Sequence, residues 1–149
     1  MKIHIVSFIV IGLILLSALS ACAPQAPALS IDTVWGKPST TVAGAGAFYM
    51  VIKNTGNADD KLLSAKSSAC GMTEVHNVVK ADDGTMKMVL MAEGIAVPAN
   101  GQLELKNGSY HIMCMKMAAD QIVAGAKPVL ELTFEKSGVK TVTVDMRNQ

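Results

Sequence analysis

The sequence predicts an all-β fold, an antiparallel β-sandwich or Greek-key barrel of about nine strands. Short runs of alternating apolar and polar residues follow one another from residue 31 onward, and turn-forming dipeptides separate them. No window of 12 or more residues in this part of the chain has a clear helical period. Strands are therefore expected at 31–35, 46–54, 61–66, 72–79, 85–91, 102–106, 109–115, 130–135 and 141–146.

The alternation is clearest near the C-terminus. Leu130, Leu132 and Phe134 alternate with polar residues, and the range 141–146 repeats this pattern. Each of these strands should have one face toward a core and one toward water. The range 118–127 lacks the pattern and is expected to be a loop with one helical turn.

The N-terminus resembles the signal peptide of a bacterial lipoprotein. Lys2 is followed by an apolar stretch at 5–16 and then by the box Leu19-Ser20-Ala21-Cys22. The resemblance implies that residues 1–21 are removed and that Cys22 is diacylated. A Pro/Ala-rich tether would then cover residues 22–30 and one domain residues 31–149, exported and lipid-anchored to a bacterial membrane, facing the periplasm or the cell exterior. An uncleaved membrane anchor is the alternative, and it places the domain outside the cytoplasm as well.

Composition excludes some classes of function. Without Lys2 the chain carries twelve basic and twelve acidic residues, so no excess of positive charge attracts nucleic acid. Only two histidines lie outside the signal, which leaves few residues that could act as a general base. The serine-hydrolase motif G-x-S-x-G and the zinc-protease motif H-E-x-x-H do not occur. The sequence therefore does not favour an enzyme.

Methionines and histidines gather in one segment. The chain has 10 methionines, of which seven lie at 72–117, together with His76 and His111. His111, Met113 and Met115 are two residues apart in an expected strand, so their side chains share one face, while Ile112 and Cys114 share the other.

A second group lies around the hairpin that follows His76. Met86 and Met88 are on its second strand and share a face, so alternation alone does not choose between them. A strict two-residue turn would instead place Met91 opposite His76.

Neutral imidazoles and thioethers make a soft, uncharged set of ligands. Such a set suits Cu(I), whereas zinc prefers thiolate or carboxylate with imidazole, and calcium and magnesium require oxygen. The alternative interpretation is that the methionines fill an irregular core. The protein would then be a lipid-anchored β-sandwich module for binding or assembly, without a metal.

Several further segments accompany those around His76 and Met86-Lys87-Met88. They are Val34-Trp35-Gly36-Lys37, Gly46-Ala47-Phe48-Tyr49-Met50, Asn54-Thr55-Gly56, Gly94-Ile95-Ala96-Val97-Pro98-Ala99 and Gly108-Ser109-Tyr110-His111-Ile112-Met113. With these segments in this order, residues 31–147 resemble the PCu(A)C family of extracytoplasmic copper chaperones. The resemblance implies a cupredoxin-like fold and a role in delivering copper toward the Cu(A) centre of cytochrome c oxidase, directly or through a thiol-containing assembly factor.

The family signature is His, ten residues, Met, twenty-one residues and His-x-Met. Carried over, it implies that His76, Met88, His111 and Met113 bind Cu(I). Each interval here is one residue longer, with eleven and twenty-two intervening residues, so Met86 is an alternative to Met88.

Cys70 and Cys114 are the cysteines within the domain. In an exported protein they either pair or stay free, and the sequence leaves both possibilities open. A blue-copper centre would need a histidine shortly after the cysteine, and none follows Cys114.

Overall fold

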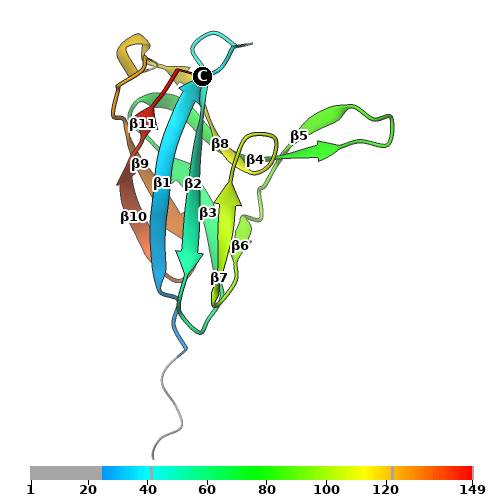
Figure 1. Cartoon of the computed structure of the whole chain (residues 1–149), viewed down its shortest axis with the longest axis vertical. Helices are drawn as coiled ribbons and strands as arrows, with labels where there is room; N and C mark the ends of the chain where they lie inside the picture. Colours follow the sequence, from blue (N-terminus) through cyan, green and yellow to red (C-terminus); the bar gives the residue numbers. More distant parts are fainter. Residues whose placement is uncertain (1–24, 41, 122, 149) are drawn as a thin grey trace, which may run out of the picture.

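Eleven strands and one 3-10 turn make up the computed structural model, which describes residues 25–40, 42–121 and 123–148 (Figure 1). The elements are β1 (Leu29–Pro38), β2 (Gly46–Asn54), β3 (Asp60–Lys66), β4 (Cys70–Lys80), β5 (Met86–Leu90), β6 (Ile95–Val97), β7 (Gly101–Leu105), β8 (His111–Met117), η2 (Ala119–Gln121), β9 (Val129–Phe134), β10 (Gly138–Thr143) and β11 (Asp145–Met146).

The strands form two sheets packed as a sandwich. The larger sheet has the order β11-β1-β2-β8-β4-β5, with β7 also pairing with β2, and the smaller has the order β10-β9-β3-β6. All described pairings are antiparallel except that of β1 with β11. The predicted all-β sandwich is thus confirmed, without closure into a barrel, and the 3-10 turn lies inside the range where one helical turn was expected.

The strand count exceeds nine for two reasons. β6 is only three residues long, too short for alternation to reveal. The range expected as one strand at 141–146 is divided, because β10 pairs with β9 in the smaller sheet and β11 pairs with β1 in the larger. Val144 lies fully buried between them, where the chain crosses from one sheet to the other.

The core lies between the two sheets. Phe48, Ile52 and Ile112 from the larger sheet and Leu62 and Leu132 from the smaller are inaccessible to solvent. Burial of this kind contributes about 1.5–3 kcal/mol per large side chain. Within the described part of the chain, no helix has the length and apolar character needed to cross a membrane.

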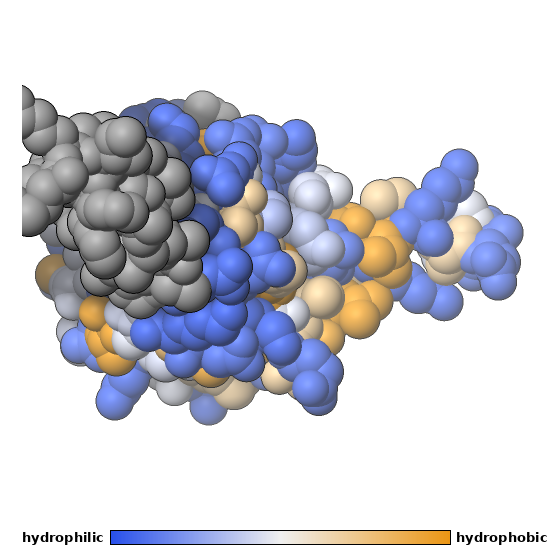
Figure 2. All heavy atoms as spheres, turned by 90° about the horizontal axis from the view of Figure 1, so that it is seen from below, coloured by the Kyte–Doolittle hydropathy of each residue, from blue (hydrophilic) through white to orange (hydrophobic). Residues whose placement is uncertain are grey.

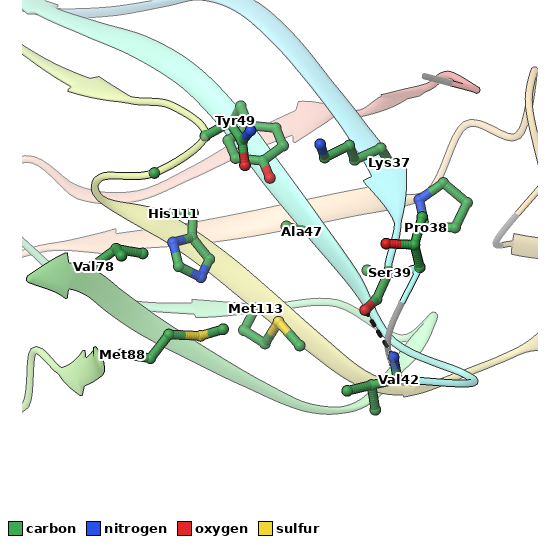
Figure 3. Close-up of a pocket in the computed structure, with 14 residues that line it drawn as sticks. Lys37, Pro38, Ser39, Val42, Ala47, Tyr49, Val78, Met88, His111 and Met113 are labelled. Carbon is green, nitrogen blue, oxygen red and sulfur yellow. Dashed lines mark hydrogen bonds between the residues drawn. The ribbon is translucent and has the colours of Figure 1, made fainter. Parts of the chain in front are cut away.

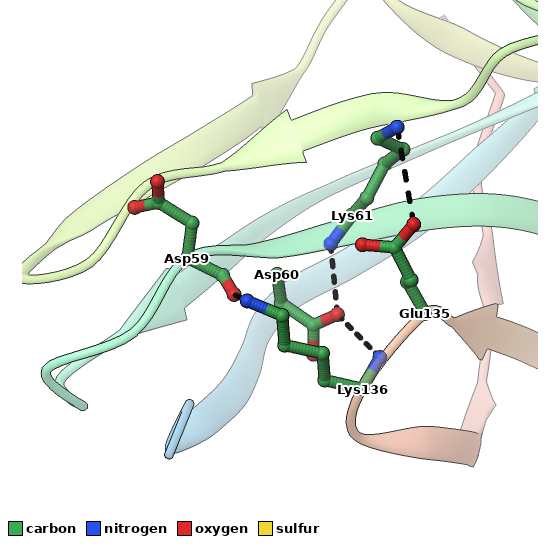
Figure 4. A network of polar contacts seen from close by, with 5 residues as sticks. All are labelled: Asp59, Asp60, Lys61, Glu135 and Lys136. Carbon is green, nitrogen blue, oxygen red and sulfur yellow. Dashed lines mark hydrogen bonds and ion pairs between the residues drawn. The ribbon is translucent and has the colours of Figure 1, made fainter. Parts of the chain in front are cut away.

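Asp60, at the start of β3, is hydrogen-bonded to the turn between β9 and β10 (Figure 4). Its buried carboxylate accepts hydrogen bonds from the backbone amides of Lys61, Lys136 and Ser137, at 2.8–3.0 Å. Burial acts to raise the pKa of Asp60, but these bonds and one from the Ser137 side chain outweigh it and hold that pKa below its usual value. The carboxylate therefore holds the β9–β10 turn against the start of β3.

The chain is already held on the domain before β1 begins. The amides of Ala26 and Ala28 donate to the side chains of Asn57 and Asn54, each at 3.0 Å. A Cβ on Gly56 would lie 2.3 Å from the carbonyl oxygen of Ala26, so only glycine admits this close passage. The expected tether over 22–30 thus becomes part of the domain from Ala26 on, while Cys22 and the signal peptide lie outside the described residues.

Strand β5 and the end of β4 form an arm that projects from the sandwich (Figure 1). All five residues of β5 are exposed. Apolar side chains gather at the base of the arm and polar ones at its tip (Figure 2). Pairing between β4 and β5 therefore stabilises the arm, and packing against the core does not.

Candidate metal centre

The two histidines lie opposite each other on neighbouring strands in the larger sheet. Residue pairing between β4 and β8 places His76 opposite His111, and Glu74 opposite Met113. The two imidazole rings meet edge to face, with 5.8 Å between their centroids and 81° between their planes. Directly opposed residues share a face of a sheet, so all four side chains lie on the same face of β4 and β8.

The other face of these strands is the core. Val75, Ile112 and Cys114 are buried there, as alternation predicted for residues 112 and 114. Cys114 forms a disulfide with Cys70, and the two Cα atoms are 5.5 Å apart. The structure thus favours the paired state of the two cysteines, and it separates their sulfur atoms from the histidine face.

His111 is held in one tautomer. The residue is 5% exposed, and Nδ1 lies 2.9 Å from the carbonyl oxygen of Ser109. A carbonyl oxygen can only accept, so Nδ1 carries the proton and Nε2 keeps its lone pair. Metal-binding histidines are typically oriented through the second nitrogen in this way.

His76 has the opposite arrangement. Its Nε2 lies 2.9 Å from a carboxylate oxygen of Glu74, so Nε2 carries the proton of the neutral ring and Nδ1 keeps the lone pair. That Nδ1 is buried, and no group in the described part of the chain is within hydrogen-bond distance of it. A buried acceptor without a partner costs about 1–3 kcal/mol, and a bound ion would remove this cost.

Glu74 was not found by the sequence reasoning, which described the set as free of carboxylates. The available signal was its spacing, since it precedes His76 by two residues on the same strand face. Its side chain, one-third exposed, adds one negative charge beside the imidazoles.

The hairpin between β4 and β5 fixes which methionine approaches the histidines. Met88 lies opposite Val78, Met86 opposite Lys80, and Leu90 opposite His76. The loop spans residues 81–85 and is closed by a hydrogen bond from the amide of Ala81 to the carbonyl of Thr85. A strict two-residue turn, which would place Met91 opposite His76, is therefore not what the structure has, because a loop over residues 81–85 takes its place.

Met88 is two residue pairs from His76 along the sheet, and Met86 is four pairs away. A step of two residues along a strand covers about 6.5–7 Å. Met91 lies beyond the end of β5, where its amide bonds to the Val75 carbonyl and its side chain packs against the core. The hairpin thus brings Met88 nearest to the histidines.

Met88, Met113 and His111 surround a shallow depression of about 350 Å³ (Figure 3). Figure 3 shows the two thioethers and the imidazole directed toward a common space, with Val78 beside them. Tyr49 closes one side, and burial raises the pKa of its phenol, which keeps it neutral. Lys37 is the charged residue of the lining.

Hard ligands are not grouped in this way. Among the described residues, no three side chains of His, Cys, Asp or Glu are placed to hold a metal ion together. Thioethers and imidazoles together form a soft donor set, which is the type of set that a soft monovalent ion prefers.

The fold is that of PCuAC domains. It matches the "Copper-bound PCuAC domain from PmoF2" with a TM-score of 0.65 and 17% identity, covering 86% of this chain and 100% of that one. It also matches the "Solution structure of CuI-DR1885 from Deinococcus Radiodurans" with a TM-score of 0.57 and 20% identity, covering 87% and 83% of the two chains. The expected resemblance to PCu(A)C domains is thereby confirmed.

The chain belongs to the family described as "Putative lipoprotein LpqE-like", whose model matches residues 29–146. It is 30% identical over 126 residues to "Putative lipoprotein Lxx21020" of Leifsonia xyli subsp. xyli, covering 83% of this chain and 72% of the relative. It is 28% identical over 128 residues to "Uncharacterized protein RP573" of Rickettsia prowazekii, covering 84% and 70%.

Proposed function

We propose that the protein is an extracytoplasmic Cu(I) carrier, and that His76, His111, Met88 and Met113 hold the ion. The observation that carries this proposal is the pairing of His76 with His111 on the outer face, each with one nitrogen left as an acceptor. Met88 and Met113 line one depression together with His111, and Met86 is the alternative to Met88.

The chemistry of this set supports a carrier. Four neutral donors bind Cu(I) without a thiolate, so the site cannot be lost to disulfide formation in an oxidising compartment. Thioethers also hold copper less strongly than paired thiolates, which allows the ion to pass to an acceptor. The copper-bound state named for two structural neighbours is consistent with this cargo.

The proposal also covers the acceptor of the copper and the lipid anchor of the chain. We infer that copper passes toward the Cu(A) centre of cytochrome c oxidase, directly or through a thiol-containing assembly factor. We further infer that Cys22 is diacylated after removal of residues 1–21, which would confine the carrier to a bacterial membrane. The lipoprotein names of the family and of one relative support the anchor.

A competition titration tests copper binding. The soluble chain from Ala23, which contains every described residue, is mixed anaerobically with a Cu(I) chelator of moderate affinity. We expect it to retain one equivalent of Cu(I) and to release zinc to a weak chelator, because the set lacks a thiolate.

Two substitutions of the same kind provide the control. Met113→Leu removes a thioether from the depression, while Met146→Leu changes a fully buried methionine of the core. We expect only the first to weaken Cu(I) binding, by one to two orders of magnitude, or about 1.4–2.8 kcal/mol. No retention of Cu(I) by the wild type would instead favour the module without a metal.

A further inference from the structure

More methionines lie on the histidine face than the proposed copper site uses. Met72 and Met115 are opposite each other on β4 and β8, on the same face as His76 and His111. Neither contributes to the depression beside Met88. This pair therefore needs a separate explanation.

Core packing does not explain the pair. The methionines of the core are Met50, Met117 and Met146, and Met91 packs against it, whereas Met72 and Met115 do neither. Met72 is 46% exposed. A half-exposed side chain outside the core gains only part of the burial energy of a core methionine, so its thioether is a further property to consider.

The geometry allows both sulfur atoms to reach one ion. Directly opposed residues have Cβ atoms about 4.5–5.5 Å apart, and a methionine has three rotatable bonds beyond Cβ. β4 and β8 also approach closely here, since a Cβ on Gly71 would lie 2.9 Å from the Cβ of Lys116. Met113 lies between this pair and the histidines, two residues from His111 and two from Met115.

We propose that Met72 and Met115, with Met113 shared, form a second and weaker site for Cu(I). Glu74, opposite Met113, supplies a negative charge between the two sites. Copper would move between them by exchange of one thioether at a time through Met113, with no change of oxidation state. The proposal rests on the proposed function for the identity of the ion, and the ligand pair itself stands on the register of β4 and β8.

Methionine methyl spectra can test this site. The chain from Ala23, labelled with ¹³C at the methionine methyls and ¹⁵N in the imidazoles, is titrated with Ag(I) in chloride-free buffer. We expect the first equivalent to shift the His76, His111 and Met113 signals. The second equivalent should shift Met72 and Met115, with a dissociation constant at least about ten-fold weaker.

A double variant and a matched control identify the ligands. The variant M72L/M115L should lose the response to the second equivalent and keep the first. Met146→Leu, which changes a fully buried methionine of the core, should keep both. Imidazole shifts without shifts of Met72 and Met115 would overturn this inference alone. Shifts of Met72 and Met115 without imidazole shifts would support it and contradict the proposed central site.

Discussion

The methionines of this domain include two groups that differ in their exposure to solvent. Met50, Met117 and Met146 are at most 6% exposed and pack in the core, whereas Met72, Met86 and Met88 are 46–61% exposed on the opposite side. The inner sulfur atoms are enclosed, since a Cβ on Gly36 would lie 2.8 Å from Sδ of Met146. One residue type thus serves packing on one face and leaves thioethers free for a soft ion on the other.

Polar groups show the same contrast. The Asp60 carboxylate has hydrogen-bond donors on both oxygens. His76 Nδ1, also buried, has no partner in the described residues. Complete pairing indicates a structural role, and the unpaired nitrogen indicates a place for a ligand.

The largest expected change in stability comes from removing the disulfide on the inner face of the larger sheet. The disulfide between Cys70 and Cys114 closes a loop of 44 residues, so the variant C70S/C114S should lose about 4 kcal/mol of unfolding free energy. Denaturant titration measures this loss, and reduction of the wild type should reproduce it. Copper binding should stay near one equivalent, and its loss in the folded variant would contradict the separation of the two faces.

A truncation in the core should have the next largest effect. Met50 is 1% exposed, so Met50→Ala leaves a cavity and should cost about 3 kcal/mol of stability. Thermal and denaturant unfolding measure this cost. Met72→Ala on the outer face is the matched control and should change stability by less than about 0.5 kcal/mol. Equal losses would show that the outer methionines are also structural.

Replacement of Asp60 tests the fully paired carboxylate. Asp60→Asn should cost about 1.5–3 kcal/mol at pH 7, because charge-assisted hydrogen bonds are lost. The folded state holds the pKa of Asp60 below its usual value, so the ionised carboxylate stabilises the fold above the unfolded pKa of about 3.9. This contribution is lost as the pH falls through the lower folded pKa. The difference between variant and wild type should therefore shrink below about pH 4, and a constant difference would contradict this role.

Substitution of a methionine on the outer face is expected to change Cu(I) binding and not stability. Met88→Leu keeps size and apolarity but removes a thioether, so it should weaken Cu(I) binding by about 1.4–2.8 kcal/mol without changing stability. Met86→Leu should change little, because Met86 lies four residue pairs from His76. The reverse result would assign the ligand role to Met86. An effect of Met91→Leu alone would contradict the observed register.

Much of this arrangement could be predicted, because strand alternation reports directly which face a side chain occupies. His111, Met113 and Cys114 were placed on the correct sides in this way. The order of strands and the hairpin register depend on contacts between distant segments, so Met88 could not be separated from Met86. Glu74 was missed because its spacing of two residues from His76 does not by itself show a contact, whereas the structure places its carboxylate 2.9 Å from the imidazole.

X-ray absorption of the Cu(I)-loaded chain tests the central claim most directly. The outer His/Met set predicts a mixed first shell, with nitrogen and sulfur scattering in comparable amounts. The same spectrum is expected from C70S/C114S, because the cysteines lie on the inner face. A shell of sulfur alone, or one of nitrogen and oxygen without sulfur, would contradict the assignment of His76, His111, Met88 and Met113 as the copper ligands.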